Sequence, residues 1–109
     1  MNPQLAFLLV RARPQPEARA RFDTWFRHVH LRDVAKIPGI GEVQAAWTAG
    51  GTRLGFYTFE SGEAVQAALQ SPQADYARGT WEQWSSELEE FSIEIFAPLF
   101  PLPIYQGQS

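Results

Sequence analysis

The first apolar segment, residues 5–13, constrains the fold most, because its apolar side chains point in both directions. Successive side chains of an extended strand point to opposite faces, and here both faces are apolar: Leu5, Phe7 and Leu9 on one, Ala6, Leu8 and Val10 on the other. A strand of this kind is usually buried on both sides of its sheet. The segment therefore predicts a sheet with helices on one face and a second covering layer on the other.

Residues 17–36 carry the periodicity of an amphipathic helix. Apolar side chains recur at the i, i+3, i+4 and i+7 positions that line one helix face: Phe22, Trp25, Phe26 and Val29. Pro38 and Gly39 follow, and such a pair is typical of the end of a helix. We expect one helix over this segment, with a break near Arg32.

The rest of the chain predicts three more strands and a second helical region. Residues 42–48 and 53–60 alternate in polarity on either side of a glycine turn, which is typical of a hairpin. A helical pattern then begins at Ser61, restarts at Pro72 and carries an apolar stripe of Ala77, Trp81, Trp84 and Leu88. Residues 91–97 alternate again, as expected of a last strand. The order β-α-β-β-α-β predicts the ferredoxin-like α+β fold, with both helices on one face of a four-stranded antiparallel sheet.

The sheet face without helices predicts a homodimer. Leaving its apolar side chains in water would forfeit roughly 1.5–3 kcal/mol for each, so we expect two copies to pack through these faces as a dimeric α+β barrel. Residues 1–98 are expected to form the domain. Residues 99–109 form a proline-rich tail that we expect to pack on the partner subunit, with a frayed end as the alternative; its apolar side chains are Leu99, Phe100, Leu102, Ile104 and Tyr105.

Composition argues against several classes of function. The chain has no cysteine, so it has neither disulfides nor thiolate metal ligands. Its N-terminal apolar run is typical of a strand and not of a signal peptide, and no stretch approaches the roughly 20 apolar residues of a membrane span, so we expect a cytoplasmic protein without membrane contact. Seven of the nine basic residues lie within residues 1–36, but they are spread over a strand and a helix, and the net charge is −3, which argues against nucleic-acid binding. The glycines lack the spacing of phosphate-binding loops, and we expect no cofactor.

Two histidines, His28 and His30, lie two positions apart in the first helix. Helical geometry turns such side chains about 200° from each other, so they cannot bind one metal ion together, and no other spacing predicts a metal site. His30 continues the apolar stripe four residues after Phe26, whereas His28 falls outside it. We expect His28 in solvent and His30 inside, either as a packed core residue or, given its near-neutral intrinsic pKa, as a general base. Asp23 or Asp33 could orient its ring.

The first helix and its exit also carry a motif of an aromatic pair, a histidine, an aspartate and a terminal Pro-Gly. The residues are Phe22, Trp25, Phe26, His30, Leu31, Asp33, Ile37, Pro38 and Gly39. The motif resembles that of the EthD-like group of dimeric α+β barrel proteins, and the order of elements agrees over residues 4–97. Arg32 stands where the family usually has proline, and Phe26 where it usually has tyrosine. The resemblance implies a fold shared by cofactor-free monooxygenases, isomerases and polyketide-modifying enzymes, with a ligand cavity between sheet and helices or within the barrel.

His30 is the one polar candidate that the resemblance carries over. Aromatic residues that could line a pocket around it are Phe22, Phe26, Trp47, Tyr57, Trp81 and Trp84, although Trp81 and Trp84 also have the spacing of core residues. We predict binding of an apolar or aromatic small molecule, with cofactor-free oxygenation or isomerisation through His30 as the enzymatic interpretation. The alternatives are a non-catalytic binding module and a structural dimer whose barrel is filled.

Overall fold

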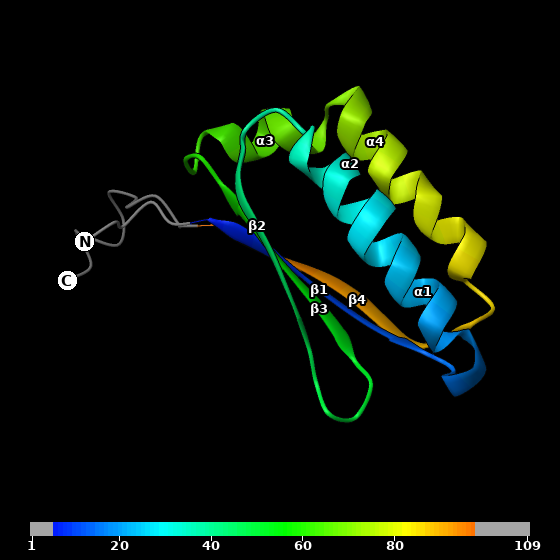
Figure 1. The fold of residues 1–109 in the computed structure, drawn as a ribbon. Coiled ribbons are helices and arrows are strands. Elements are labelled where there is room, and N and C mark those ends of the chain that lie inside the picture. The colour runs from blue at the N-terminus through cyan, green and yellow to red at the C-terminus, as the bar shows by residue number, and fades with distance from the viewer. Residues whose placement is uncertain (1–5, 98–109) are drawn as a thin grey trace, which may run out of the picture.

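The protein folds as one antiparallel sheet with a layer of helices on one face (Figure 1). The computed structural model describes residues 6–97. Four strands form the sheet: β1 (Phe7–Pro14), β2 (Ile40–Trp47), β3 (Arg53–Phe59) and β4 (Leu88–Phe96). Their order across the sheet is β2-β3-β1-β4, and every neighbouring pair is antiparallel. This is the predicted ferredoxin-like α+β fold, with β1 and β3 in the centre and β2 and β4 at the edges. The proline-rich tail, residues 99–109, lies outside the described residues.

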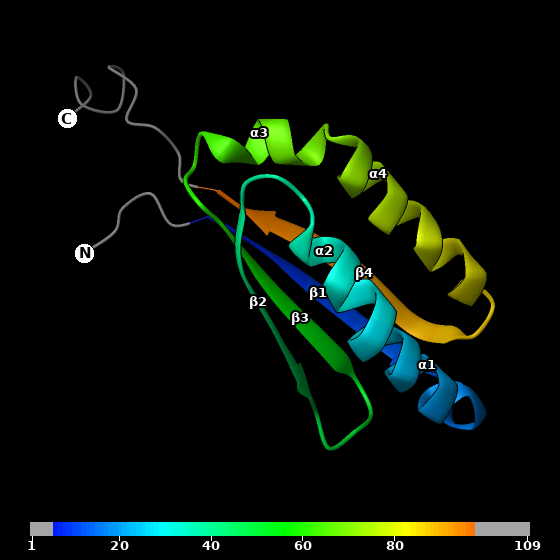
Figure 2. The same ribbon diagram turned by 45° about the horizontal axis from the view of Figure 1, so that its top comes forward.

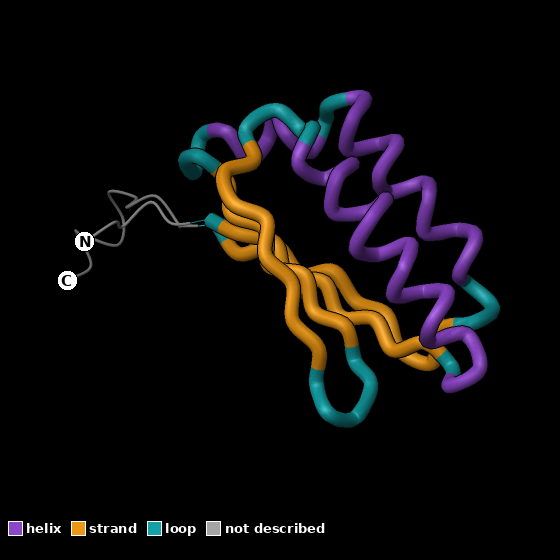
Figure 3. The backbone as a smooth tube through the Cα atoms, viewed as in Figure 1, coloured by secondary structure: helices purple, strands orange, loops and turns teal. Residues whose placement is uncertain are grey.

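The first helical region is continuous but not regular. After a 3₁₀ turn at Pro16–Ala18, α1 (Arg19–Trp25) passes into a π-helical turn (Phe26–His30) and then into α2 (Leu31–Ala35). The tube in Figure 3 shows this region without interruption. The backbone N–H of Leu31 bonds to the carbonyl of Phe26, five residues back. The break expected near Arg32 is therefore wrong, because the irregularity lies one turn earlier, at the segment that contains both histidines. Such π turns are rare and occur frequently at functional sites.

The second helical region is divided in two. α3 (Ala64–Leu69) is followed by α4 (Pro72–Gly79), which lies beside α2 over the sheet (Figure 2). Ser71 begins α4 as its N-cap, since its hydroxyl oxygen accepts the backbone N–H of Ala74 at 3.1 Å. A 3₁₀ turn at Thr80–Trp84 ends the region. Leu88, predicted to belong to the helical stripe, is instead the first residue of β4, because the helical backbone stops before it.

The central strand β1 has two apolar faces, as its sequence predicts. Val10 and Ala12 point toward the helices and are fully buried. On the opposite face, the Phe7 ring contacts that of Phe56 at 4.7 Å and that of Phe96 at 4.6 Å between centroids. Phe96 remains 44% exposed. Within residues 6–97 no second layer covers this aromatic group, which makes the bare face of the sheet apolar toward the end where β1 begins and β4 ends.

The core beneath the helices consists of two clusters. The larger one packs α1 and the 3₁₀ turn Thr80–Trp84 against the sheet and is rich in aromatic rings: Phe22, Trp25, Phe26, Tyr57, Trp81 and Trp84. The smaller one lies under α3 and contains Ala6, Phe59, Val65 and Ala68. None of the helices within residues 6–97 has the length and apolarity that a membrane crossing requires.

Candidate functional site

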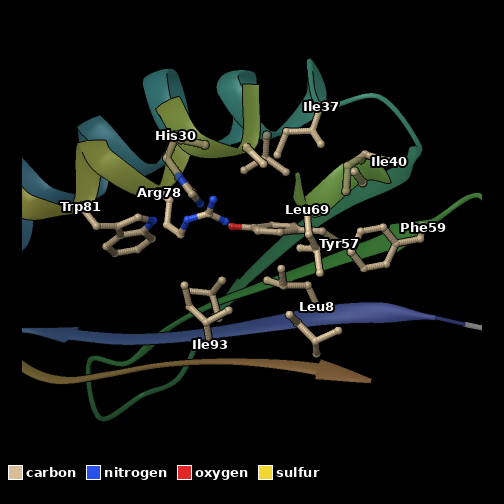
Figure 4. A pocket seen from close by; sticks show the side chains of 16 residues that line it. Leu8, His30, Ile37, Ile40, Tyr57, Phe59, Leu69, Arg78, Trp81 and Ile93 are labelled. Carbon is tan, nitrogen blue, oxygen red and sulfur yellow. The ribbon is translucent and has the colours of Figure 1, made fainter. Parts of the chain in front are cut away.

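A cavity of about 240 Å³ lies between the sheet and the helices, where the two core clusters meet (Figure 4). Strands β1, β3 and β4 contribute the side chains beneath it: Leu8, Val10, Tyr57, Phe59, Ile93 and Ile95. Most of the remaining lining comes from α2, α3 and α4 and is aliphatic. Three lining residues carry polar side-chain groups other than an indole: His30, Tyr57 and Arg78. The site is therefore an apolar chamber with very few hydrogen-bonding groups, which is the usual make-up of a small-molecule pocket.

The cavity opens between α4 and the edge strand β4. Its most exposed lining residues are Arg78 on α4 and Ile93 and Ile95 on β4, and the two isoleucines are 37% and 46% exposed although they point toward the helices. The Arg78 guanidinium forms an ion pair with Asp75 one helical turn earlier, and both side chains are well exposed. A ligand entering here would pass a charged rim before it meets the apolar interior.

His30 is the buried polar residue that the helical layer contributes to this chamber. It is 2% exposed, and its Nε2 lies 2.7 Å from the Tyr57 hydroxyl. Its ring stacks on Trp25 at 5.3 Å and meets Trp81 edge-on at 4.8 Å between centroids. Burial among these rings penalises the imidazolium form and lowers the pKa of His30 to about 3. The imidazole is therefore neutral at physiological pH.

Tyr57 reaches His30 because residue 55 is a glycine. A β-carbon at Gly55 would lie 2.3 Å from the Tyr57 hydroxyl oxygen and 2.6 Å from Cζ, so the Tyr57 ring occupies the space that a side chain would need. The ring extends along β3 toward the helices, and Figure 4 shows its oxygen pointing toward His30. Burial raises the pKa of the Tyr57 hydroxyl, which therefore keeps its proton.

The structure separates the aromatic residues that the sequence nominates. Tyr57 and Trp81 line the cavity with His30, whereas Phe22, Phe26, Trp47 and Trp84 do not. Phe22, Phe26 and Trp84 pack in the larger core cluster, and Trp47 lies at its edge, with its ring 5.7 Å from that of Phe26. Whether any of the six binds a ligand stays a prediction, and only Tyr57 and Trp81 have a place in the cavity.

Neither nominated aspartate contacts the imidazole within the described chain. Asp33 is buried on α2 but lines a separate hollow with Lys36, Gln73 and others, not the cavity of His30. Asp23 forms a two-point ion pair with the buried Arg53, one contact of which is 2.8 Å long. The partner of His30 is Tyr57, a residue from the opposite layer that lies 27 positions further along the chain.

Most of the lining residues were not nominated from the sequence, among them Arg78, Ile93 and Ile95. Ile93 and Ile95 alternate with polar residues on β4, and that pattern indicates that they face the helices, but it does not show that they border an open space. The orientation of Arg78 depends on how α4 sits on the sheet. His28 is exposed and lies off the cavity, as predicted from its spacing with His30.

Within residues 6–97, no group of three or more histidine, aspartate or glutamate side chains is arranged to hold a metal ion.

No protein-family model and no curated protein matches the sequence. The fold, in contrast, has many solved counterparts. Fold and sheet topology define a ferredoxin-like α+β protein of the kind seen in EthD family proteins and in proteins similar to antibiotic biosynthesis monooxygenases.

Three solved structures illustrate the likeness. Rv0793 from Mycobacterium tuberculosis is 20% identical, with a TM-score of 0.66 over 89% of this chain and 97% of its own. SnoaB, a cofactor-independent oxygenase from Streptomyces nogalater, is 15% identical, with a TM-score of 0.65 over 92% of this chain and 98% of its own. An EthD family protein from Bacillus halodurans is 18% identical, with a TM-score of 0.63 over 82% of this chain and 96% of its own. At these identities the likeness concerns the fold, and it agrees with the EthD-like resemblance of the first helix.

Proposed function

We propose that the protein binds an apolar or aromatic small molecule in the cavity beside His30. The observation that carries this proposal is the cavity itself. Its volume is about 240 Å³, its lining is mostly aliphatic, and it contains one hydrogen-bonded buried pair, His30 and Tyr57. A dry cavity of about 150 Å³ lined by aliphatic and aromatic side chains is enough to hold benzene. The present cavity therefore suits a ring with a substituent, or two small fused rings. The alternative of a purely structural dimer with a filled barrel does not explain why this cavity is left open.

Naphthalene is a suitable first probe, because it consists of two fused rings without a polar group. Titration followed by two-dimensional NMR should shift the methyl signals of Leu8 and Ile93 and leave distant signals in place. Replacing Ala77, which lines the cavity, with phenylalanine should weaken binding at least about tenfold, since the new ring takes the ligand's space. Ala67→Phe, at an exposed position on α3, is the matched control and should bind as the natural protein does. Equal affinity in the two variants would contradict the proposal.

The enzymatic form of the proposal is cofactor-free oxygenation or isomerisation, with His30 as general base. The structural likeness to SnoaB and the position of His30 on the cavity wall support it. The lowered pKa of His30, about 3, favours the non-catalytic alternative, because so weak a base removes protons only from strongly activated substrates.

Hydrogen–deuterium exchange separates the two forms. If His30 is a base, the protein should accelerate exchange at C1 of 2-indanone in D₂O, where the ring and the carbonyl both activate the C–H bond, and His30→Ala should abolish the acceleration while His28→Ala leaves it unchanged. Binding without accelerated exchange would identify a binding module.

We also propose that two copies pack through the bare faces of their sheets. The aromatic group of the half-buried Phe7 and Phe56 and the exposed Phe96 supports this, because monomers rarely leave such a group in water. Phe56→Lys should convert the dimer to a monomer in light-scattering measurements. Tyr76→Lys, which changes an exposed aromatic residue on α4, should leave the dimer intact. A monomeric natural protein would refute this part of the proposal.

A further inference from the structure

The hydrogen bond between His30 and Tyr57 determines what the proposed ligand must offer, and the inference below rests on the proposed binding function. A neutral imidazole carries one N–H, so two tautomers fit the 2.7 Å contact. In the first, Nε2–H donates to the Tyr57 oxygen and Nδ1 keeps a lone pair. In the second, the Tyr57 hydroxyl donates to Nε2, and the proton of the ring is on Nδ1.

The surroundings of Nδ1 favour the first tautomer. Nδ1 of His30 is buried and has no hydrogen-bond partner within residues 6–97. The ring that carries it lies against Trp25 and Trp81, whose ring faces are only weak hydrogen-bond acceptors. Buried N–H groups without a partner are rare in native proteins, and an unfilled acceptor is tolerated more readily. A proton on Nδ1 would create a buried N–H without a partner, whereas a lone pair on Nδ1 leaves only an unfilled acceptor, which costs less free energy.

In this tautomer the Tyr57 oxygen accepts a hydrogen bond from His30, and the hydroxyl hydrogen of Tyr57 remains available for donation to another group. No second partner for the hydroxyl occurs in the described chain, and Tyr57 lines the cavity. Burial keeps the hydroxyl protonated, because its pKa is raised. The interior of the chamber therefore offers the Tyr57 O–H as a hydrogen-bond donor whose position is fixed by His30, and the indole N–H of Trp81 is the other neutral donor of the lining. The cationic donor of the lining, Arg78, is at the exposed mouth and is already paired with Asp75.

We propose that the ligand is a carbonyl compound on an apolar ring or chain, and that its oxygen accepts a hydrogen bond from the Tyr57 hydroxyl. His30 is then a positioning residue, which donates to the hydroxyl oxygen and directs the O–H into the cavity. Gly55 completes the arrangement, since a side chain there would displace the Tyr57 ring. Tyr57, and not the histidine shared with the EthD-like motif, makes the polar contact with the ligand.

The binding test compares 1-indanone with indane, which has the same two rings without the carbonyl. Calorimetric titration of the natural protein should give an affinity about fivefold higher for 1-indanone, as expected for one net hydrogen bond between neutral groups. Tyr57→Phe keeps the ring but removes the donor, so the preference should disappear or reverse because the carbonyl is then buried unpaired. His30→Phe should reduce the preference, and His30→Gln, whose amide can still donate, should restore part of it.

Long-range ¹H–¹⁵N NMR of His30 provides an independent readout, with the exposed His28 replaced by glutamine to remove its signals. The expected result is a proton on Nε2 and an unprotonated Nδ1, in the free protein and with 1-indanone bound. A proton on Nδ1 would overturn the proposal whatever the affinities are. Equal binding of both compounds, unaffected by Tyr57→Phe, would overturn the carbonyl class and leave small-molecule binding standing. If naphthalene, indane and 1-indanone all fail to bind, the proposed function fails and the ligand class fails with it.

Discussion

Acidification should destabilise the protein through His30. The pKa of His30 is about 3 in the folded chain, against an ordinary value of 6.5 for a histidine side chain in water. The unfolded chain therefore binds a proton between these two values that the folded chain does not bind. Stability contributed by the neutral imidazole is present above pH 6.5 and is lost as the pH falls toward 3, which is the sign expected when folding lowers the pKa of a base.

The size of the effect follows from the pKa difference. Each unit corresponds to about 1.4 kcal/mol, and at pH 4 the unfolded chain has protonated His30 almost completely while the folded chain has hardly begun. The free energy of unfolding should thus fall by about 3 kcal/mol between pH 7 and pH 4 through this residue alone. The whole free energy of unfolding of a small domain is roughly 5–15 kcal/mol, so this contribution is a large share of it.

Urea denaturation at several pH values, followed by tryptophan fluorescence, measures this contribution. The carboxylates titrate in the same range, so the informative quantity is the difference between the natural protein and His30→Gln, which cannot titrate at residue 30. That difference should change by about 3 kcal/mol between pH 7 and pH 4, with the variant gaining relative to the natural protein as the pH falls. His28→Gln is the matched control, because His28 is exposed. Parallel curves for the natural protein and His30→Gln would show that His30 is not held neutral by burial and would refute the reasoning.

Three further substitutions test other parts of the architecture. Gly55→Ala should cost about 1–3 kcal/mol in urea denaturation, because the new methyl group displaces the Tyr57 ring, and it should shift the NMR signals of His30; unchanged signals would contradict the close packing of Tyr57 on Gly55. Asp23→Asn should cost about 3–5 kcal/mol, since it leaves the Arg53 guanidinium buried without its charged partner, and a loss below about 1 kcal/mol would show that this pair is effectively solvated. Ser71→Ala removes the N-cap of α4 and should lower thermal stability by about 1 kcal/mol, whereas Ser71→Asn should retain most of it.

The sequence by itself determined the fold class and the order of the elements. Apolar residues with a period of two require strands, and those with a period near 3.6 require helices, so the pattern of this chain leaves few arrangements. The two apolar faces of β1 likewise follow from alternation within a single strand. The separation of His28 from His30 was also accessible, because local helical geometry turns side chains two positions apart away from each other, and the π turn does not change this result.

The site was decided by the tertiary structure. The contact between Tyr57 and His30 depends on the distance between the helical layer and β3, and on the absence of a side chain at Gly55. The sequence pattern around the histidine contains neither of these two conditions. The nominated acids Asp23 and Asp33 lie on the same helical region as His30, yet Asp23 pairs with Arg53 on β3 and Asp33 lines a different hollow. Hydrophobic periodicity identifies the face of an element that is buried, but it does not distinguish a buried side chain packed in a core from one that borders a void. That distinction depends on how completely two layers fill the space between them, and only the assembled structure shows it.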